Sequence, residues 1–256
     1  MHPVLFTLGP LHFYSYGLMI ALGFLAANFL ATRRAAVVGI DPARIQSVTL
    51  TALIAGLAGG RLAYVLLQWE LYRNNPLEIL RLDHGGLVFF GGLAAGLAGG
   101  IWAIRRAGMP VLRTVDLLIP PLTVAHALGR IGCFLNGCCY GKVTSLPWGR
   151  HPTQLYEMLA LLGIFFLLKR IERRNPRPTE AVPSSLPRKC RSAGAPRPGT
   201  VLLAYGLSYG VWRFLVEFLR GDNPPVAWGL TVFQLISLGV VAVSAALLAA
   251  RRLRRA

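Results

Sequence analysis

Long apolar segments alternate with short polar segments along almost the whole chain. The apolar segments lie at 14–31, 45–67, 86–104, 112–128, 153–168, 200–217 and 228–250. Each is close to the ~20 helical residues that cross a bilayer. The pattern therefore predicts an all-α, polytopic membrane protein with about seven transmembrane helices, in a single transmembrane domain that covers residues 1–256. No Lys or Arg precedes the first segment, so we expect it to stay as a helix rather than be cleaved as a signal peptide.

Two features of these segments carry expectations about packing. The fourth segment contains Pro120-Pro121, and proline inside a helix removes a backbone hydrogen bond and clashes with the preceding turn. We therefore expect this segment to be kinked or made of two half-helices. The stretches LIAGLAGGRL (53–62) and LAAGLAGGIW (93–102) resemble each other. Small residues at helical spacing let membrane helices approach closely, which is favoured over a duplicated substrate site.

The basic residues predict an orientation. Nineteen of the 27 Lys and Arg residues follow the first, third, fifth and seventh segments, against seven on the other side. Since cytoplasmic loops are enriched in Lys and Arg, we expect the N-terminus outside and the C-terminus in the cytoplasm. The stretch 172–199 is rich in Pro, Arg and Ser, which predicts a disordered basic cytoplasmic loop. A solvated linker is favoured for it over a site for anionic lipid headgroups.

Composition narrows the class of protein. The 256 residues are 54% hydrophobic and 14% charged, with a mean hydropathy of +0.53. A soluble domain has about 25% charged residues, so an ordinary soluble enzyme and a disordered chain are both disfavoured. The net charge of +17 comes from basic residues placed between apolar segments. That distribution is typical of membrane topology rather than of a nucleic-acid-binding face, and we expect no nucleic-acid partner.

In this orientation, the polar residues of the segments, which are energetically costly to place in a membrane, gather near the outer leaflet. Arg61, Arg130 and Arg213 fall at this depth, and ionisable residues inside a membrane mark functional sites by default. A guanidinium binds two phosphate oxygens at once, so the layer points to a phospholipid headgroup. Two ordinary explanations stay open. Arg213 and Glu217 could pair one turn apart on a helix, and Arg61 and Arg130 could reach lipid headgroups by snorkelling.

The stretch HALGRIGCFLNGCCYG (126–141) holds three of the four cysteines. Cys133, Cys138 and Cys139, together with His126 or His151, are conceivable zinc ligands. Adjacent cysteines rarely both ligate one ion, and the spacing is not C-x₂-C, so we expect no metal. A disulfide on the oxidising outer side or packing as small apolar side chains is favoured.

Six pieces of the chain, taken in order, resemble the bacterial prolipoprotein diacylglyceryl transferases. They are HFYSYGLMIALGF (12–24), GGRLAYV (59–65), GGLVFFGG (85–92), GRIGCFLNGCCYG (129–141), RHPTQLYE (150–157) and YGVWRFLVEFLR (209–220). The resemblance covers nearly everything outside the basic loop. It implies seven helices with an outer-leaflet site, in a multi-pass enzyme of the bacterial cytoplasmic (inner) membrane that modifies proteins during lipoprotein biosynthesis.

The implied reaction moves the diacylglyceryl group of phosphatidylglycerol onto the lipobox cysteine thiol in the signal peptide of a preprolipoprotein. A thioether forms and glycerol phosphate leaves, and no cofactor or metal is expected. Two alternatives remain. One is a re-purposed or noncatalytic relative that binds phospholipid or uses a different acceptor. The other is a membrane transporter, which would place ionisable residues near the midplane within inverted repeats.

Position by position, the resemblance carries functional residues onto this chain. The essential arginines fall on Arg130 and Arg213, and further family polar positions fall on Tyr16, Arg61, Asn136, Glu157, Tyr209 and Glu217. We predict catalytic roles for Arg130, Arg213, Tyr16 and His151, and substrate binding by the rest together with the backbone at Gly137.

The chain also departs from many family members, at Phe90, Cys133 and Cys138. Many members carry histidine where this chain has Phe90, which cannot accept a proton. A thiol must become a thiolate to attack carbon, and nearby arginines would favour that form and neutralise the departing phosphate. The candidates for a base, if one is needed, are His151, Glu157 and Tyr16.

Overall fold

The computed structural model describes residues 3–9, 11–81, 85–145, 147, 149–174 and 198–253. The chain divides into two compact units, one made of Met1–Ala31 with Val115–Ala256 and the other of Thr32–Thr114. Each unit is described by itself. Most of the predicted disordered loop lies outside the described residues. Its first residues, 172–174, are helical, so the boundary predicted at 172 is wrong.

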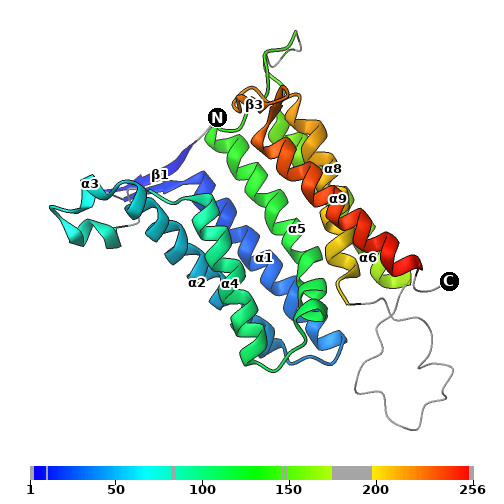
Figure 1. Cartoon of the computed structure of the whole chain (residues 1–256). Coiled ribbons are helices and arrows are strands. Elements are labelled where there is room, and N and C mark those ends of the chain that lie inside the picture. The colour runs from blue at the N-terminus through cyan, green and yellow to red at the C-terminus, as the bar shows by residue number, and fades with distance from the viewer. Residues whose placement is uncertain are drawn as a thin grey trace, which may run out of the picture. The chain divides into compact units, whose positions relative to one another are not determined.

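Helices dominate both units (Figure 1). They are α1 (Ser15–Val37), α2 (Pro42–Leu67), α3 (Trp69–Tyr72), α4 (Phe89–Arg106), α5 (Val111–Asn136), α6 (Thr153–Arg174), α8 (Thr200–Glu217) and α9 (Val232–Leu253), with a 3-10 turn η1 (Pro76–Leu80). Each predicted apolar segment corresponds to one of these helices. Among the described residues, α1, α2, α5 and α9 are long and apolar enough to cross a membrane. The prediction of a helical, multi-pass membrane protein is confirmed, while the number of crossings and the orientation stay predictions.

Helix α5 runs through both of its prolines without interruption. Of the two expected forms, the division into two half-helices is therefore wrong, and the kink stays a prediction. Pro120 is fully buried, and the hydroxyl of Thr123 donates a hydrogen bond to the Pro120 carbonyl at 2.7 Å. Side chains and neighbouring helices commonly support a proline-weakened turn where it is buried in protein. One continuous helix therefore carries residues from Val111 to Asn136.

In the unit 32–114, helices α2 and α4 pack almost backbone to backbone. A Cβ atom added at Gly59 would lie 2.1 Å from the Cβ of Ala95 and 2.8 Å from the carbonyl oxygen of Gly91. A Cβ atom at Gly91 would lie 2.4 Å from the Cβ of Ala63. The similar glycine-rich stretches thus face each other as a packing seam, as the sequence favoured.

Arg61 near the end of α2 binds the segment that leads to α4. Its guanidinium donates to five backbone carbonyls, those of Glu78, Ile79, Arg81, Gly85 and Gly86, at 2.7 to 3.2 Å. A guanidinium has five N–H donors, so the number of accepting carbonyls equals the number of donors of Arg61. This arginine therefore fixes the loop fold around η1.

In the other unit, a buried apolar cluster joins α5, α6 and α8. It consists of Ile119, Ile164, Leu168 and Val201. The buried carboxylate of Asp116 on α5 accepts hydrogen bonds from the backbone N–H groups of Gly199 and Leu202, at 2.8 and 2.9 Å. The first N–H groups of a helix lack partners within that helix and favour a negative charge, so this carboxylate anchors the start of α8 to α5.

Two short hairpins, which the sequence pattern did not predict, accompany these helices. Strand β1 (Val4–Leu8) pairs antiparallel with β2 (Leu11–Tyr14) before α1. Strand β3 (Pro225–Ala227) pairs antiparallel with β4 (Leu230–Thr231) between α8 and α9. The two residues of the second turn, Trp228 and Gly229, both have positive φ, 50° and 73°, as two-residue hairpin turns of type I′ require. This turn brings Thr231 back toward the end of α8.

Replacing Gly59 tests the packing seam. Gly59→Ala should lower the free energy of unfolding by roughly 1–3 kcal/mol, because its Cβ overlaps the opposing helix. The matched control is Gly239→Ala in α9, where an added Cβ meets nothing within 4 Å and alanine is the better helix former. Thermal unfolding in detergent micelles measures both. Equal stability of the two variants would contradict a close α2–α4 contact.

Candidate functional site

The first cluster of the site surrounds the buried carboxylate of Glu157, near the start of α6. An Nη2 nitrogen of Arg130 lies 2.8 Å from Oε1 of Glu157, and the hydroxyl of Tyr209 on α8 donates to the same oxygen at 2.7 Å. Nε2 of His126 lies 3.8 Å from it. His126 and Arg130 are one turn apart on α5, so both face this carboxylate. Three helices thus converge on one oxygen atom.

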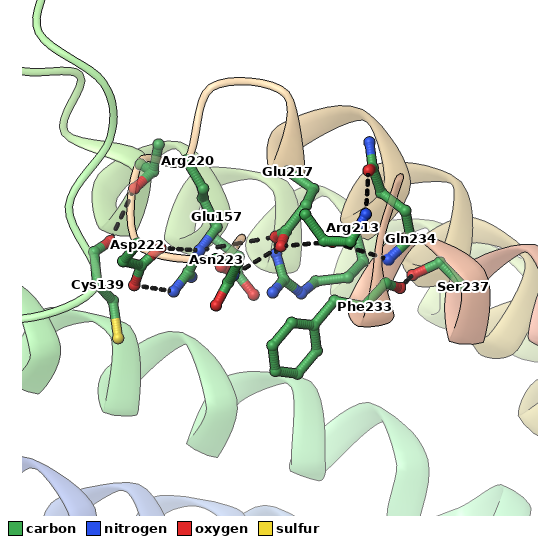
Figure 2. A network of polar contacts seen from close by, with 12 residues as sticks. Cys139, Glu157, Arg213, Glu217, Arg220, Asp222, Asn223, Phe233, Gln234 and Ser237 are labelled. Carbon is green, nitrogen blue, oxygen red and sulfur yellow. Dashed lines mark hydrogen bonds and ion pairs between the residues drawn. The ribbon is translucent and has the colours of Figure 1, made fainter. Parts of the chain in front are cut away.

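The second cluster surrounds the buried carboxylate of Glu217, at the end of α8 (Figure 2). Arg213, one turn earlier, forms an ion pair with it at 2.5 Å. Asn223 and the hydroxyl of Thr231 donate to its other oxygen at 2.6 and 2.8 Å. The guanidinium carbon of Arg213 lies 4.8 Å from the centre of the Phe233 ring on α9. The i,i+4 pair expected as the ordinary explanation does form, within a larger network.

Arg220 extends this second cluster. Its Nε lies 3.6 Å from Glu217, and its guanidinium binds Asp222 through two hydrogen bonds of 3.0 and 2.6 Å. A bidentate pair of this kind fixes the orientation of the guanidinium. The turn after α8 is therefore tied by side chains to the end of the helix.

The two clusters are electrostatic neighbours. His126 is close enough to feel the charges of Arg130, Glu157 and Arg213 together. Its ring meets the Tyr209 ring edge to face, with centroids 5.1 Å apart, and Tyr205 stacks on Tyr209 at 5.6 Å. Two aromatic rings therefore pack beside His126 in the region of the first cluster.

One donor of this region has no protein partner. The Nε–H of Arg130 is buried and makes no hydrogen bond within the part of the chain that the structure describes. An unsatisfied buried donor on a cation costs free energy, so such groups call for an explanation, which in a functional site is commonly a bound ligand. Glu157 binds this guanidinium through Nη2, so the Nε–H remains as a donor for an oxyanion.

The outer loop after α5 is fixed by its neighbours. Gln154 donates to the carbonyl of Cys138 at 2.7 Å, and Thr153 donates to that of Cys139 at 2.8 Å. The N–H of Lys142 donates to the Leu219 carbonyl at 2.7 Å. The loop therefore bridges the start of α6 and the end of α8.

The three cysteines of this region are free thiols. Their sulfur atoms all lie within 4.8 Å of one another, so the cluster is the candidate metal ligand set in the described residues. A hydrogen bond with Cys133 and the charge of Arg220 lower the pKa of the Cys139 thiol to about 5, against burial, which raises it. Burial raises the pKa of the Cys138 thiol.

The structure brings together some of the sequence-predicted residues. Arg130, Glu157 and Tyr209 meet in the first cluster, and Arg213 and Glu217 meet in the second. Tyr16 lies in the first turn of α1, where a Cβ added at Gly132 of α5 would lie 3.2 Å from its ring.

The remaining predicted residues lie outside the two clusters. Asn136 ends α5 and Gly137 follows it with a φ of 75°. His151 sits in the outer loop with Nδ1 at 3.5 Å from the Tyr156 hydroxyl. Arg61 binds carbonyls in the other unit. No role of these residues in a reaction follows from position alone, and their predicted functions stay predictions.

Four members of the network were not among the predicted site residues. They are Arg220, Asn223, Thr231 and His126, of which His126 was considered only as a zinc ligand. His126 had a usable signal, because it precedes Arg130 by four residues and so shares its helix face. Asn223 and Thr231 had none, since the hairpin that positions them has no strong sequence pattern.

Comparison with known proteins gives a consistent result. Residues 3–250 match the profile of a family described as prolipoprotein diacylglyceryl transferase. The chain is 34% identical to the phosphatidylglycerol–prolipoprotein diacylglyceryl transferase of Clostridium tetani, over 95% of each chain. It is 35% identical to the protein of the same name from Geobacter sulfurreducens, over 89% of this chain and 85% of that one. It is also 35% identical to that of Nitratidesulfovibrio vulgaris, over 93% and 88%.

The charge on Glu217 is expected to be essential for folding. Glu217→Gln keeps the shape but leaves Arg213 buried without its counter-charge, which should lower the free energy of unfolding by about 3–5 kcal/mol. The control is Glu70→Gln, which breaks an exposed ion pair with Arg73 worth about 1 kcal/mol or less. Thermal unfolding in micelles compares them. A Glu217→Gln variant as stable as the control would mean that the pair is not desolvated.

Proposed function

The chain belongs to the prolipoprotein diacylglyceryl transferase family, and from that membership we propose the reaction that it catalyses. It transfers the diacylglyceryl group of phosphatidylglycerol to the lipobox cysteine thiol in the signal peptide of a preprolipoprotein. The acceptor sulfur forms a bond to the glycerol carbon as the bond from that carbon to the phosphate oxygen breaks. The phosphate takes the electron pair and leaves as glycerol phosphate. We further propose that this takes place in the bacterial inner membrane.

The observation that carries this proposal is the unpaired Nε–H of Arg130, buried beside a second arginine. Negative charge grows on the phosphate as the carbon–oxygen bond breaks. Fixed donors aimed at developing charge stabilise a transition state most in a site with little water. Glu157 holds Arg130 through Nη2 and leaves the Nε–H for a phosphate oxygen. Arg213 is likewise positioned by its neighbours, through the ion pair with Glu217 and the contact with the Phe233 ring.

The buried glutamates support an orienting role rather than a role as bases. Glu157 already accepts from Arg130 and Tyr209 through one oxygen, and Glu217 accepts from Arg213, Asn223 and Thr231. A carboxylate that balances an arginine is a weak proton acceptor, because the cation stabilises its ionised form. Both glutamates therefore hold the arginines in place.

His126 is the proton acceptor that the geometry favours. It feels the charges of both arginines and its ring meets that of Tyr209, whereas the ring of His151 contacts Tyr156. An imidazole can take the proton of a thiol during a reaction. In this chain, whose Phe90 replaces a histidine common in the family, His126 would take the proton of the acceptor thiol as the sulfur attacks.

An apolar groove between α6 and α8 suits the acyl chains of the lipid. It has a volume of about 350 Å³ and is lined by Ala160, Gly163, Ile164, Leu167, Ser208, Val211, Trp212 and Leu215. A two-chain lipid leaves the bilayer only at a cost of about 0.8 kcal/mol for each exposed methylene, so lateral entry is expected.

The function is tested by transfer to a defined acceptor. Purified protein is incubated with phosphatidylglycerol vesicles and a lipobox peptide, and mass spectrometry should record a gain of one diacylglyceryl group on the cysteine. Arg130→Ala and Arg213→Ala should each lower the rate by about 100-fold or more, with near-normal amounts of protein in the membrane. Arg130→Lys should recover only part, because an ammonium lacks the planar fork.

The control for these variants is Arg73→Ala, an exposed arginine of the other unit, which should transfer at the parental rate. Parental turnover in Arg130→Ala would contradict the phosphate-binding role. A parental protein that binds the lipid vesicles but modifies no peptide would instead indicate the noncatalytic or re-purposed alternative.

A pair of histidine variants identifies the proton acceptor. His126→Gln should lower the rate of the chemical step by about 100-fold or more, as general-base removal typically does. His151→Gln should change the rate far less. The two are compared by single-turnover transfer across pH 6–9, where the loss from His126→Gln should shrink as rising pH ionises the acceptor thiol directly. The reverse ranking of the two variants would assign the base to His151.

A further inference from the structure

The cysteine cluster is unused by the proposed reaction, in which the acceptor supplies its own thiol. We propose that Cys133, Cys138 and Cys139 form a binding site for one soft, thiophilic metal ion with a filled d shell, Cu(I) or Zn(II). The inference concerns a function separate from transfer. It revises the expectation, based on the adjacency of Cys138 and Cys139, that no metal binds here.

The spacing of the sulfur atoms is close to what such an ion requires. All three lie within 4.8 Å of one another. Metal–sulfur bonds of about 2.3 Å place ligand sulfurs about 3.8 Å apart in a tetrahedral site. Small rotations of the side chains would therefore complete the site without moving the backbone.

The backbone explains how adjacent cysteines reach one point. The N–H of Cys138 donates to the carbonyl of Cys133 at 3.1 Å, which folds the chain back over the end of α5. Cys139 adopts a φ of 61°, a left-handed conformation that is rare for a side-chain-bearing residue. This conformation reverses the direction of the chain next to Cys138 and Cys139. Thr153 and Gln154 donate hydrogen bonds to the carbonyls of Cys139 and Cys138, so residues of α6 fix the arrangement.

Two arginines lie near the cluster. The charge of Arg220 acts on Cys139, and that of Arg130 acts on Cys133 and Cys139. Groups around the ligand atoms orient and tune a metal site. In the described residues no fourth His, Cys, Asp or Glu joins the cluster. Three thiolates suit Cu(I), whereas Zn(II) would take water as a fourth ligand.

Direct binding to the full chain tests the site. A Cys190→Ser background leaves the three cluster thiols as the only cysteines, and the reduced protein is titrated in detergent without oxygen. Cd(II), as a spectroscopic probe for Zn(II), should produce a sulfur-to-metal charge-transfer band that saturates at one ion per chain. Cu(I) is titrated separately against a competing chelator, and the tighter ion is the assigned one. The unmodified chain, which keeps Cys190, serves as the control and should bind the same single ion.

Each single Cys→Ser change should weaken binding at least tenfold, and the triple change should abolish it. If a variant is less stable, the melting temperature provides the second measure: the ion should raise that of the Cys190→Ser protein and leave that of the triple variant unchanged. Absence of the band, undiminished affinity in the single variants, or an intact mass lower by two hydrogens, which marks a disulfide, would overturn the proposal. Transfer activity is measured on the Cys138→Ser, Cys139→Ser variant, and its retention separates this site from the proposed reaction.

Discussion

The pairing of buried arginines with buried glutamates is the constraint on which the site depends. An unpaired charge inside a protein costs several kcal/mol, and the cost is met here by Glu157 for Arg130 and by Glu217 for Arg213. Each pair also joins separate parts of the chain. Glu157 links α5, α6 and α8, and Glu217 links α8 to the hairpin before α9 through Thr231. The fold around the site is therefore organised by its charges as much as by its apolar contacts.

This arrangement explains how a transferase of this family can handle an anionic lipid. A carboxylate that fully neutralised Arg130 would compete with a phosphate, yet Glu157 holds one edge of the guanidinium and leaves Nε unsatisfied. In the proposed reaction, such a site would be positioned before the ligand arrives, and little reorganisation would be needed as charge develops on the leaving phosphate. The aromatic rings of Tyr205 and Tyr209 keep water away from one side of this region.

Helices and their packing were predictable from sequence because membrane solvation imposes length and composition on every span. The glycine seam between α2 and α4 was predictable for the same reason, and the arginines of the site followed from their depth and the family resemblance. The continuity of α5 was not predictable from sequence. It depends on the burial of Pro120 and on the hydrogen bond from Thr123 to the Pro120 carbonyl, which are tertiary features. The binding of the Arg61 donors to carbonyls of a loop was not predicted either, because that loop has no strong sequence pattern. The convergence of the cysteines depends on the φ of Cys139, which no sequence pattern specifies.

A structure of the full chain with phosphatidylglycerol bound, determined in a lipid nanodisc, tests the central claim most directly. The account predicts a phosphate oxygen within hydrogen-bond distance of Nε of Arg130, with the ion pair between Arg130 and Glu157 still formed and the acyl chains beside α6 and α8. A headgroup bound elsewhere, with Nε of Arg130 still without a partner, would contradict it.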